Sequence, residues 1–242
     1  MKIYVVTHEN MTAELPEGYE LFKVGGADGT TLPNDSTGDN ISVKNPYYCE
    51  LTAAYWIWKN DKTSDIVGLM HYRRFLTTKP ERQREYISES EVRGLLENCD
   101  FIATPLFRNR PSVKQVMFDG VRESDYLLLR SVVGEKYPEM LDVFDEVFDG
   151  QYTYFCNICV TRLAEWDKYC EWLFGVLFEL EKRVDMTGYS AKEKRLYGYL
   201  SERLFTVYTK FFKKRVTSVR LIAPKKPFLT RVRNKLKKIF GI

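Results

Sequence analysis

The order of apolar and polar positions divides most of the chain into short apolar runs and longer amphipathic segments. The short runs predict strands, and they lie at residues 2–6, 21–24, 66–70, 99–104 and 152–160. The longer segments have apolar side chains at helical spacing and predict helices, which lie at residues 46–60, 89–98, 124–137, 140–148, 166–184 and 196–212. Because strands alternate with helices, we predict one layered α/β domain with a mostly parallel central sheet.

The helix predicted at residues 46–60 has two start signals and one unusual side chain. Asn45 suits the N-cap and Pro46 suits the first helical position. Glu50 lies among the apolar residues, so we expect its carboxylate to be partly buried and to need a partner. The arginines that follow the next strand are the nearest candidates. Residues 106–118, which follow Pro105 and carry Arg108, Arg110, Pro111 and Lys114, predict a surface loop.

The strand predicted at residues 66–70 ends in the sequence His-Tyr-Arg-Arg at positions 71–74. A buried strand that delivers several cationic side chains to its carboxyl end suits an anionic ligand. Ligands of open α/β sheets bind at such strand ends. Two alternatives stay open: His71 is a hydrogen-bonded core histidine, or the arginines form structural ion pairs with Glu50 or Asp65.

Composition changes this picture little. The 242 residues are 44% hydrophobic, which is enough for one α/β domain with a full core. No apolar run approaches the roughly 18 residues of a membrane-spanning helix, and we expect the first residues to form a strand rather than a signal peptide. Five cysteines include one Cys-x-x-Cys pair, Cys156 and Cys159. Without a second pair, reduced thiols of a cytoplasmic protein are favoured over a metal or redox site.

Charge is distributed unevenly along the chain. Residues 210–242 contain twelve Lys or Arg and no acidic residue, whereas the remainder contains 33 acidic and 25 basic residues. We therefore divide the chain into a globular domain at residues 1–215 and a basic amphipathic C-terminal helix at residues 216–242. The apolar side chains of this tail fall near one face and suit an anionic membrane surface; they are Leu229, Val232, Leu236, Ile239 and Phe240. A solvated basic end is the alternative.

Nucleotide hydrolysis, dinucleotide redox chemistry and nucleic-acid binding are all disfavoured. The chain has no Walker sequence and no Gly-x-Gly-x-x-Gly, so nucleotide hydrolysis and dinucleotide redox chemistry are not expected. Nucleic acid is not expected either, because the domain is acidic and the tail has few aromatic residues. The glycine-rich loop at residues 25–29 offers backbone amides to a phosphate, although glycines in a loop are a weak signal.

Several long, ordered segments carry a resemblance to a known family. They are Asp39-Asn-Ile-Ser42, Lys44-Asn45, Tyr48-Cys-Glu-Leu-Thr52, Tyr55-Trp-Ile-Trp-Lys-Asn60, Gly68-Leu-Met-His-Tyr-Arg-Arg74, Tyr169-Cys-Glu-Trp-Leu-Phe174 and Gly198-Tyr-Leu-Ser-Glu-Arg-Leu204. In these segments the chain closely resembles the domain of unknown function 4422. That family occurs in bacterial capsule, exopolysaccharide and O-antigen synthesis clusters. It includes galactofuranosyltransferase domains of glycosyltransferase family 111.

The resemblance implies a GT-A-like glycosyltransferase that moves a sugar from a UDP-sugar to a growing bacterial surface polysaccharide. Galactofuranose is one candidate for that sugar. Many GT-A enzymes place Asp-x-Asp at the end of a central strand, where it holds a divalent metal on the diphosphate. The comparable strand of this chain ends in His-Tyr-Arg-Arg instead. Fixed cations neutralise a leaving diphosphate without a metal, so we expect neither a metal nor another cofactor.

Transfer with inversion also needs a base that deprotonates the acceptor hydroxyl. Glu202 is the first candidate and Asp119 the second, and a structural ion pair is the alternative role of Glu202. Phe-Cys-Asn-Ile at residues 155–158 resembles the acceptor-side Phe-Asn-Ser/Ala-Gly strand of such transferases, with Ile158 and Cys159 where a glycine is expected. The substrate-binding candidates are Thr7, His8, Asp39 and Asn40 for the nucleotide, His71, Arg73 and Arg74 for the diphosphate, and Asn45, Glu50, Tyr72, Asn157 and Arg203.

The expected partners follow from the same resemblance. They are a nucleotide-sugar donor, a glycan or lipid-linked oligosaccharide acceptor, and an anionic membrane surface bound by the C-terminal tail. We therefore expect a cytoplasmic protein that associates peripherally with the inner face of the plasma membrane. The alternative function is a non-catalytic glycan- or lipid-phosphate-binding module that scaffolds polysaccharide assembly through the same cationic site.

Overall fold

A computed structural model describes residues 1–26, 29–80 and 82–222 of the chain. Its centre is a sheet with the strand order β2-β1-β3-β8-β5-β9. The strands are β1 (Lys2–Thr7), β2 (Tyr19–Lys23), β3 (Ile66–His71), β5 (Phe101–Ala103), β8 (Cys159–Arg162) and β9 (Val216–Ser218). All of them run in the same direction except β8, which is antiparallel to both β3 and β5. The predicted α/β fold with a mostly parallel sheet is confirmed.

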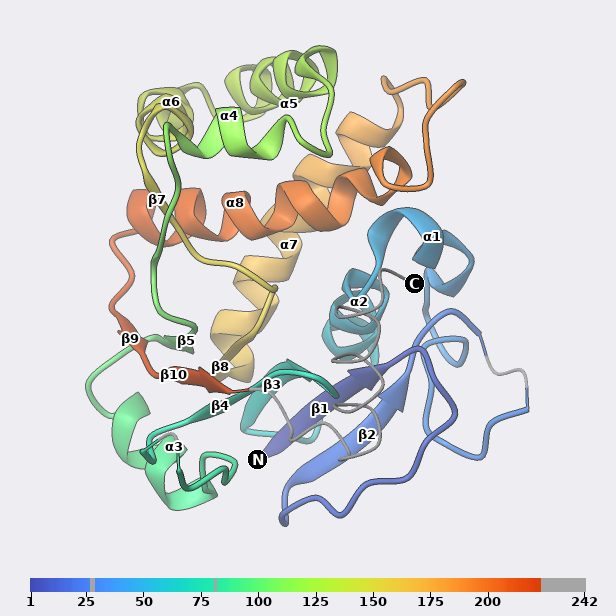
Figure 1. Cartoon of the computed structure of the whole chain (residues 1–242), viewed down its shortest axis with the longest axis vertical. Helices are drawn as coiled ribbons and strands as arrows, with labels where there is room; N and C mark the ends of the chain where they lie inside the picture. The colour runs from blue at the N-terminus through green and yellow to red at the C-terminus, as the bar shows by residue number, and fades with distance from the viewer. Residues whose placement is uncertain (27–28, 81, 223–242) are drawn as a thin grey trace, which may run out of the picture.

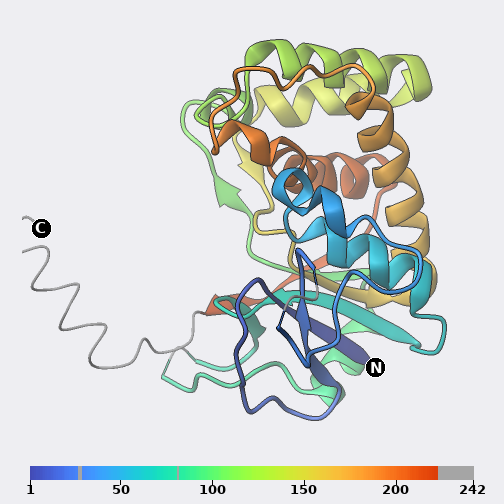
Figure 2. The same cartoon turned by 90° about the vertical axis from the view of Figure 1, so that its right-hand side faces the viewer.

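Most helices cover one face of this sheet (Figure 1). The helices are α1 (Asn45–Tyr48), α2 (Leu51–Asn60), α3 (Glu89–Leu96), α4 (Val113–Met117), α5 (Glu123–Lys136), α6 (Leu141–Asp149), α7 (Leu163–Glu181) and α8 (Leu196–Phe211). Figure 2 shows α2, α7 and α8 next to the sheet and α5 and α6 stacked beyond them. The short helix α3 lies on the opposite face, and Ser88 begins it with a capping box.

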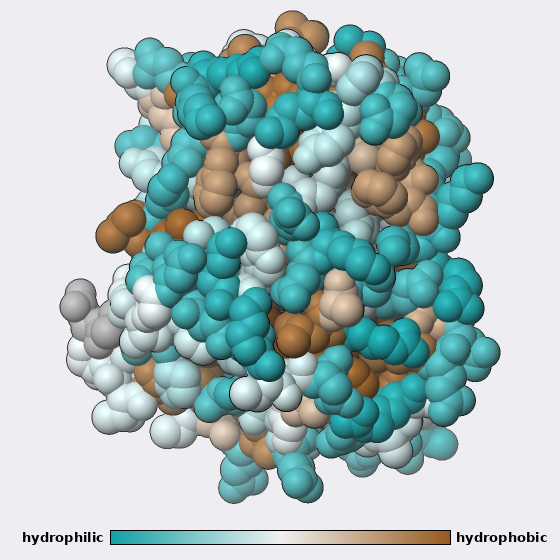
Figure 3. All heavy atoms as spheres, turned by 180° about the vertical axis from the view of Figure 1, so that it is seen from behind, coloured by the Kyte–Doolittle hydropathy of each residue, from teal (hydrophilic) through white to brown (hydrophobic). Residues whose placement is uncertain are grey.

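Two hydrophobic cores follow from the alternation of side chains along the strands. In β1, Tyr4 and Val6 face the large core under the helices, whereas Ile3 and Val5 face the smaller core on the α3 side. Gly68 in the middle of β3 is also explained, because a Cβ atom there would lie 2.7 Å from the Val160 side chain of β8. Seen from behind, the surface is mainly hydrophilic with separate hydrophobic patches (Figure 3).

Two predicted elements are interrupted in the structure. The helix predicted at residues 46–60 is broken at Cys49, whose φ of 53° lies in the left-handed region, so that α1 and α2 are separate helices. Asn45 is the first residue of α1 rather than its N-cap, and Pro46 is the second. The strand predicted at residues 152–160 is likewise replaced by β7 (Tyr152–Thr153), a turn at residues 156–157, and β8.

Other segments have more structure than the sequence pattern predicts. Residues 106–118 contain α4 and β6 (Phe107–Arg108), which pairs with β7. The tail was expected to begin at residue 216, but residues 216–222 form β9, which pairs with β5, and β10 (Arg220–Ile222), which pairs with β4 (Phe75–Thr77). The amphipathic helix predicted around residues 229–240 lies outside the described residues.

Candidate active site

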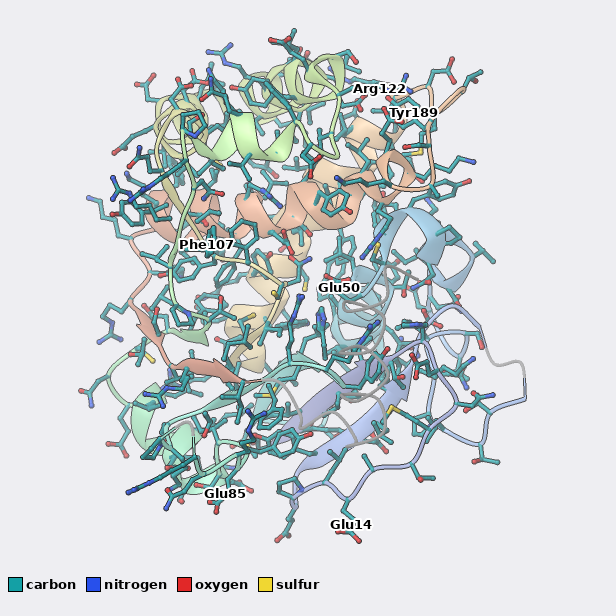
Figure 4. All side chains as sticks on the ribbon, in the orientation of Figure 1. Glu14, Glu50, Glu85, Phe107, Arg122 and Tyr189 are labelled. Carbon is teal, nitrogen blue, oxygen red and sulfur yellow. The ribbon has the colours of Figure 1, made fainter. Side chains whose placement is uncertain are left out.

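A cleft of about 670 Å³ opens at the carboxyl ends of β1 and β3. This is where open α/β sheets bind their ligands. The polar residues that line it come from four parts of the chain: Thr7 and His8 after β1, His71, Tyr72, Arg73 and Arg74 after β3, Asn45, Cys49 and Glu50 around the α1–α2 break, and Cys156, Arg195 and Glu202 from the β7–β8 turn and α8. Glu50 lies near the centre of the molecule, between the sheet and α8 (Figure 4).

A tight turn presents the two arginines that follow β3. The His71 N–H donates to the Arg74 carbonyl at 3.1 Å, and the Arg74 N–H donates back to the His71 carbonyl at 2.9 Å. The chain therefore reverses from β3 into β4 at this point, and the side chains of both arginines are exposed. The Arg73 guanidinium lies 4.7 Å over the Tyr72 ring, which is a cation–π contact. Residues 71–74 thus lie together, and all four line the cleft.

Two arginines of the cleft are held by cysteine side chains. Arg74 donates to the Cys156 Sγ at 3.1 Å, and Arg195 donates to the Cys49 Sγ at 3.3 Å. Burial raises the pKa of both thiols, so they are neutral near pH 7. A neutral thiol is a weak acceptor. It orients each guanidinium without neutralising its charge, which stays available to an anionic ligand.

Both cysteines stand in strained backbone. Cys49, Cys156 and Asn157 have φ values of 53°, 77° and 49°, a region that residues other than glycine rarely adopt. Such conformations cost on the order of 1–3 kcal/mol each and concentrate at functional sites. Gly198 of α8 makes room for one of them, since a Cβ atom there would lie 3.2 Å from the Cys49 Sγ.

A hydrogen-bond network connects the two strained turns. The Asn157 side-chain amide donates to the Glu50 Oε1 at 2.8 Å and to the Gly198 carbonyl at 3.2 Å. Its carbonyl oxygen accepts a 2.9 Å hydrogen bond from the Ser201 hydroxyl. Glu50 is thus satisfied by Asn157, and not by the arginines that the sequence indicated. The expectation that Glu50 lies within a helix is also wrong, because Glu50 is the N-cap residue of α2.

His71 contributes no positive charge near neutral pH. Burial is the main cause that lowers its pKa, and the charges of Arg74 and Arg73 lower it further, against the opposing effect of Glu50. The ring Nε2 lies 3.9 Å from the Glu50 Oε1 and has no hydrogen-bond partner within the described residues. The cleft therefore takes its positive charge from arginines alone, rather than from arginines and His71 together.

Glu202 has the properties of a proton acceptor. Burial raises its pKa to about 7 and Glu50 raises it as well, while Arg203, the Cys156 N–H and Arg74 act in the opposite direction. Its Oε1 accepts a 2.9 Å hydrogen bond from the Cys156 N–H, and its Oε2 is paired with Arg203. Arg203 is only 5% exposed and its guanidinium lies 4.8 Å from the centre of the Phe155 ring. Arg203 is paired with Glu202 but does not line the cleft.

The residues expected to contact the nucleotide are only partly brought together. Thr7 and His8 line the cleft, and the His8 ring packs edge-on against Tyr72 with 5.6 Å between ring centres. Asp39 and Asn40 do not line it. Asp39 accepts a hydrogen bond from the Tyr55 hydroxyl, and its backbone bonds to the Asn60 side chain.

The second candidate base also lies away from the cleft. Asp119 has a side chain that is 85% exposed and is paired with Lys192 at 2.6 Å. The amides of the glycine loop already have an acceptor within the protein, because Gly25 and Gly26 donate hydrogen bonds to the buried Asp35 carboxylate. That leaves the arginines, rather than loop amides, as the anion-binding groups of the cleft.

The sequence analysis missed three polar lining residues, Cys49, Cys156 and Arg195. The Cys-x-x-Cys spacing includes Cys156, but no sequence pattern places any of the three in the cleft, because their positions depend on two turns that depart from the predicted helix and strand. Over the described ranges, no group of three or more His, Cys, Asp or Glu side chains is arranged to hold a metal ion. All five cysteines are free thiols.

Comparison with known proteins identifies the family. A family model described as a domain of unknown function, DUF4422, matches residues 2–214, and the chain belongs to this family. A solved structure of WbbM, described as a bifunctional glycosyltransferase in its apo form, is similar to it with a TM-score of 0.81 and 29% sequence identity. The match covers 94% of this chain and 46% of that one, so the chain spans about half the length of WbbM. No curated protein matches it significantly.

One structural observation is relevant to the expected association with a membrane. None of the helices in the described part of the chain is both long enough and apolar enough to cross a bilayer.

Proposed function

We propose that the protein is a glycosyltransferase of GT-A type that transfers a sugar from a UDP-sugar to a bacterial surface polysaccharide. The observation that carries this proposal is that one cleft contains both exposed arginines, which form no direct ion pair with a carboxylate of the described residues, and a carboxyl group with a pKa of about 7. The first suits a diphosphate and the second suits a general base. The likeness to WbbM supports the same class of reaction.

In this proposal Arg73 and Arg74 hold the donor diphosphate. Both extend from the turn after β3, and each presents planar N–H donors that match phosphate oxygens. The nucleoside extends toward Thr7 and His8, and the exposed His8 ring and the partly buried Tyr72 ring offer it an aromatic surface. Galactofuranose is the sugar that the family resemblance favours.

The reaction begins when the Glu202 carboxylate accepts the proton of the acceptor hydroxyl. That oxygen forms a bond to the anomeric carbon of the donor, and the bond from this carbon to the diphosphate oxygen breaks. UDP leaves with the electron pair and with its added negative charge. Arg73 and Arg74 stabilise this charge because they are fixed next to the diphosphate before the reaction starts.

We further propose that these arginines replace the divalent metal. A carboxylate at the end of β3 would need a metal ion to hold a diphosphate, whereas a guanidinium binds it directly. We also propose that the basic C-terminal tail brings the enzyme to the membrane, where a lipid-linked acceptor would reside. This last step rests on the sequence pattern of residues 229–240.

The experiment that tests the proposed function is donor hydrolysis by the purified protein. Glycosyltransferases release UDP slowly when water replaces the acceptor, so we expect UDP formation from one member of a panel of UDP-sugars that includes UDP-galactofuranose. A non-catalytic binding module would bind UDP in the same cleft and release none from any donor. UDP binding together with a complete lack of hydrolysis and transfer would favour that alternative.

A further inference from the structure

Arg195 is a third arginine in the cleft, in addition to the two that we propose bind the donor diphosphate. Arg195 immediately precedes α8, and its guanidinium is oriented by the Cys49 Sγ and lies 5.6 Å over the Tyr199 ring. Within the described residues, its direct contacts are a neutral thiol and an aromatic ring. The hydrogen bond to Cys49 is the main cause that raises the pKa of Arg195, and the charge of Glu50 raises it further without a direct ion pair. Arg195 therefore presents to the cleft a positive charge that forms no direct ion pair with a carboxylate of the described residues, as Arg74 does from the other strained turn.

The position of Arg195 relative to Glu202 indicates which substrate it meets. Arg195 ends the 3-10 helix Glu193–Arg195 and is the N-cap of α8, and Glu202 follows it by seven positions, so seven residues of helix span about 10 Å between them. Both side chains line the cleft. Gly198 lies between them, and the absence of a side chain there leaves this side of the helix open to Cys49. Helix α8 and the residue before it therefore line the cleft from Glu202, the proposed base, to Arg195.

Arg74 of the β3–β4 turn is connected to Glu202 and His71. Arg74 contacts Cys156, whose N–H bonds to Glu202, and it also influences the pKa of His71 and of Glu202. Arg195 contacts Cys49, on the other side of Glu50 in the network. The arginines that line the cleft therefore come from two elements, the β3–β4 turn and the start of α8.

We propose that Arg195 binds an anionic group of the acceptor, a phosphate or a carboxylate, at a position separate from the donor diphosphate. The inference rests on the proposed function, because it takes Glu202 as the base that meets the acceptor hydroxyl. An acceptor whose hydroxyl lies at Glu202 extends along α8, and its anionic group reaches Arg195. Arg195 then decides which acceptors bind, and Arg73 and Arg74 decide donor affinity.

The test is a calorimetric titration of the full-length protein with two probes. UDP is titrated first, and galactose 1-phosphate is then titrated into the UDP-saturated protein, with galactose as the uncharged comparison. We expect galactose 1-phosphate to bind wild type in the presence of UDP. R195Q should weaken that binding about tenfold or more, the effect of losing a hydrogen bond to a charged group, while UDP affinity stays within twofold.

The matched control is K194Q, which removes a positive charge from the adjacent exposed residue that does not line the cleft. It should leave both titrations unchanged. Methyl phosphate and glucuronic acid, titrated in the same way, show whether the position prefers a phosphate or a carboxylate.

Three results would overturn the inference in distinguishable ways. If UDP abolishes binding of galactose 1-phosphate and R195Q weakens UDP as strongly as R74Q does, Arg195 belongs to the donor site. If wild type with bound UDP binds galactose 1-phosphate no better than galactose, the second position does not exist. If wild type fails to bind UDP at all, the proposed function fails and this inference fails with it.

Discussion

The side-chain amide of Asn157 donates a 2.8 Å hydrogen bond to the Glu50 carboxylate and joins two turns that are 107 residues apart in the chain. One turn separates α1 from α2, and the other precedes β8. Each turn contains a cysteine with positive φ that is hydrogen-bonded to an arginine of the cleft. The bond between Asn157 and Glu50 therefore fixes the two arginine-bearing walls of the cleft relative to each other.

The first prediction concerns the energy of this connection. Asn157→Ala leaves the mostly buried Glu50 carboxylate without its 2.8 Å donor, so we expect the variant to lose on the order of 1–3 kcal/mol of unfolding free energy. Glu50→Ala should cost a similar amount, and the double variant should cost clearly less than the sum of the two. Urea unfolding of the four proteins measures this coupling.

The control for this cycle is Asn98→Ala, at an exposed residue after α3, which should change stability by less than about 0.5 kcal/mol. Additive effects of Asn157→Ala and Glu50→Ala would contradict the connection. A Glu50→Gln variant with wild-type stability but no turnover would instead give Glu50 a direct catalytic role.

The second prediction assigns donor affinity to the β3–β4 turn. Arg73→Ala and Arg74→Ala should each weaken UDP binding about tenfold or more, because each removes charge-assisted hydrogen bonds to the diphosphate. Both side chains are exposed, so the melting temperature should hardly change. Calorimetry with UDP measures the affinity, and Arg108→Ala in the exposed strand β6 is the control. Unfolding of the variants with unchanged UDP affinity would make the two arginines structural.

The fold was largely predictable because its main elements are specified by local periodicity. Strands β1 and β3 and helices α5, α6, α7 and α8 lie close to their predicted ranges. The cationic end of β3 was predictable for the same reason, since a buried strand fixes where the residues after it emerge.

The missed features depend on contacts between distant segments. Helical periodicity continues through Cys49, and nothing in the local sequence shows that this residue takes a positive φ against Gly198 of α8. The short strands β9 and β10 were assigned to a basic tail because their pairing partners, β5 and β4, are far away in the sequence. Arg195 was missed because only the break at Cys49 brings a thiol to it.

The third prediction is that catalysis does not depend on a divalent metal. The reason is chemical: the end of β3 presents guanidinium groups, which neutralise a diphosphate directly. Turnover with the identified donor should therefore be the same, within about twofold, before and after exhaustive treatment with EDTA. Loss of turnover on chelation that Mn²⁺ or Mg²⁺ restores would show that a metal ion is required.

The fourth prediction concerns the basic tail. Each Lys or Arg close to an anionic leaflet contributes roughly 1 kcal/mol to binding, and added salt weakens this contribution. Removal of residues 228–242 should therefore abolish sedimentation with phosphatidylglycerol vesicles and leave turnover on a short soluble acceptor unchanged. The truncated protein binding these vesicles as well as the full-length protein would refute a docking role for the tail.

The fifth prediction follows from the raised pKa of Glu202. Burial brings this pKa to about 7, and only the ionised carboxylate accepts a proton from the acceptor. As pH rises from 5 to 7 the ionised fraction grows, so kcat/KM should increase about tenfold per pH unit and then level off above an apparent pKa of about 7. A group that had to be protonated for activity would give the opposite slope.

The most direct measurement of the central claim is the pH dependence of UDP release from the identified UDP-sugar by wild type and Glu202→Gln, with UDP affinity measured in parallel. Glu202→Gln keeps the size of the side chain and removes the base, so we expect unchanged or tighter UDP binding, a rate reduced at least about a hundredfold, and loss of the step near pH 7. Near-wild-type UDP release by Glu202→Gln, with the same rise through pH 7, would contradict the assignment of Glu202 as the base.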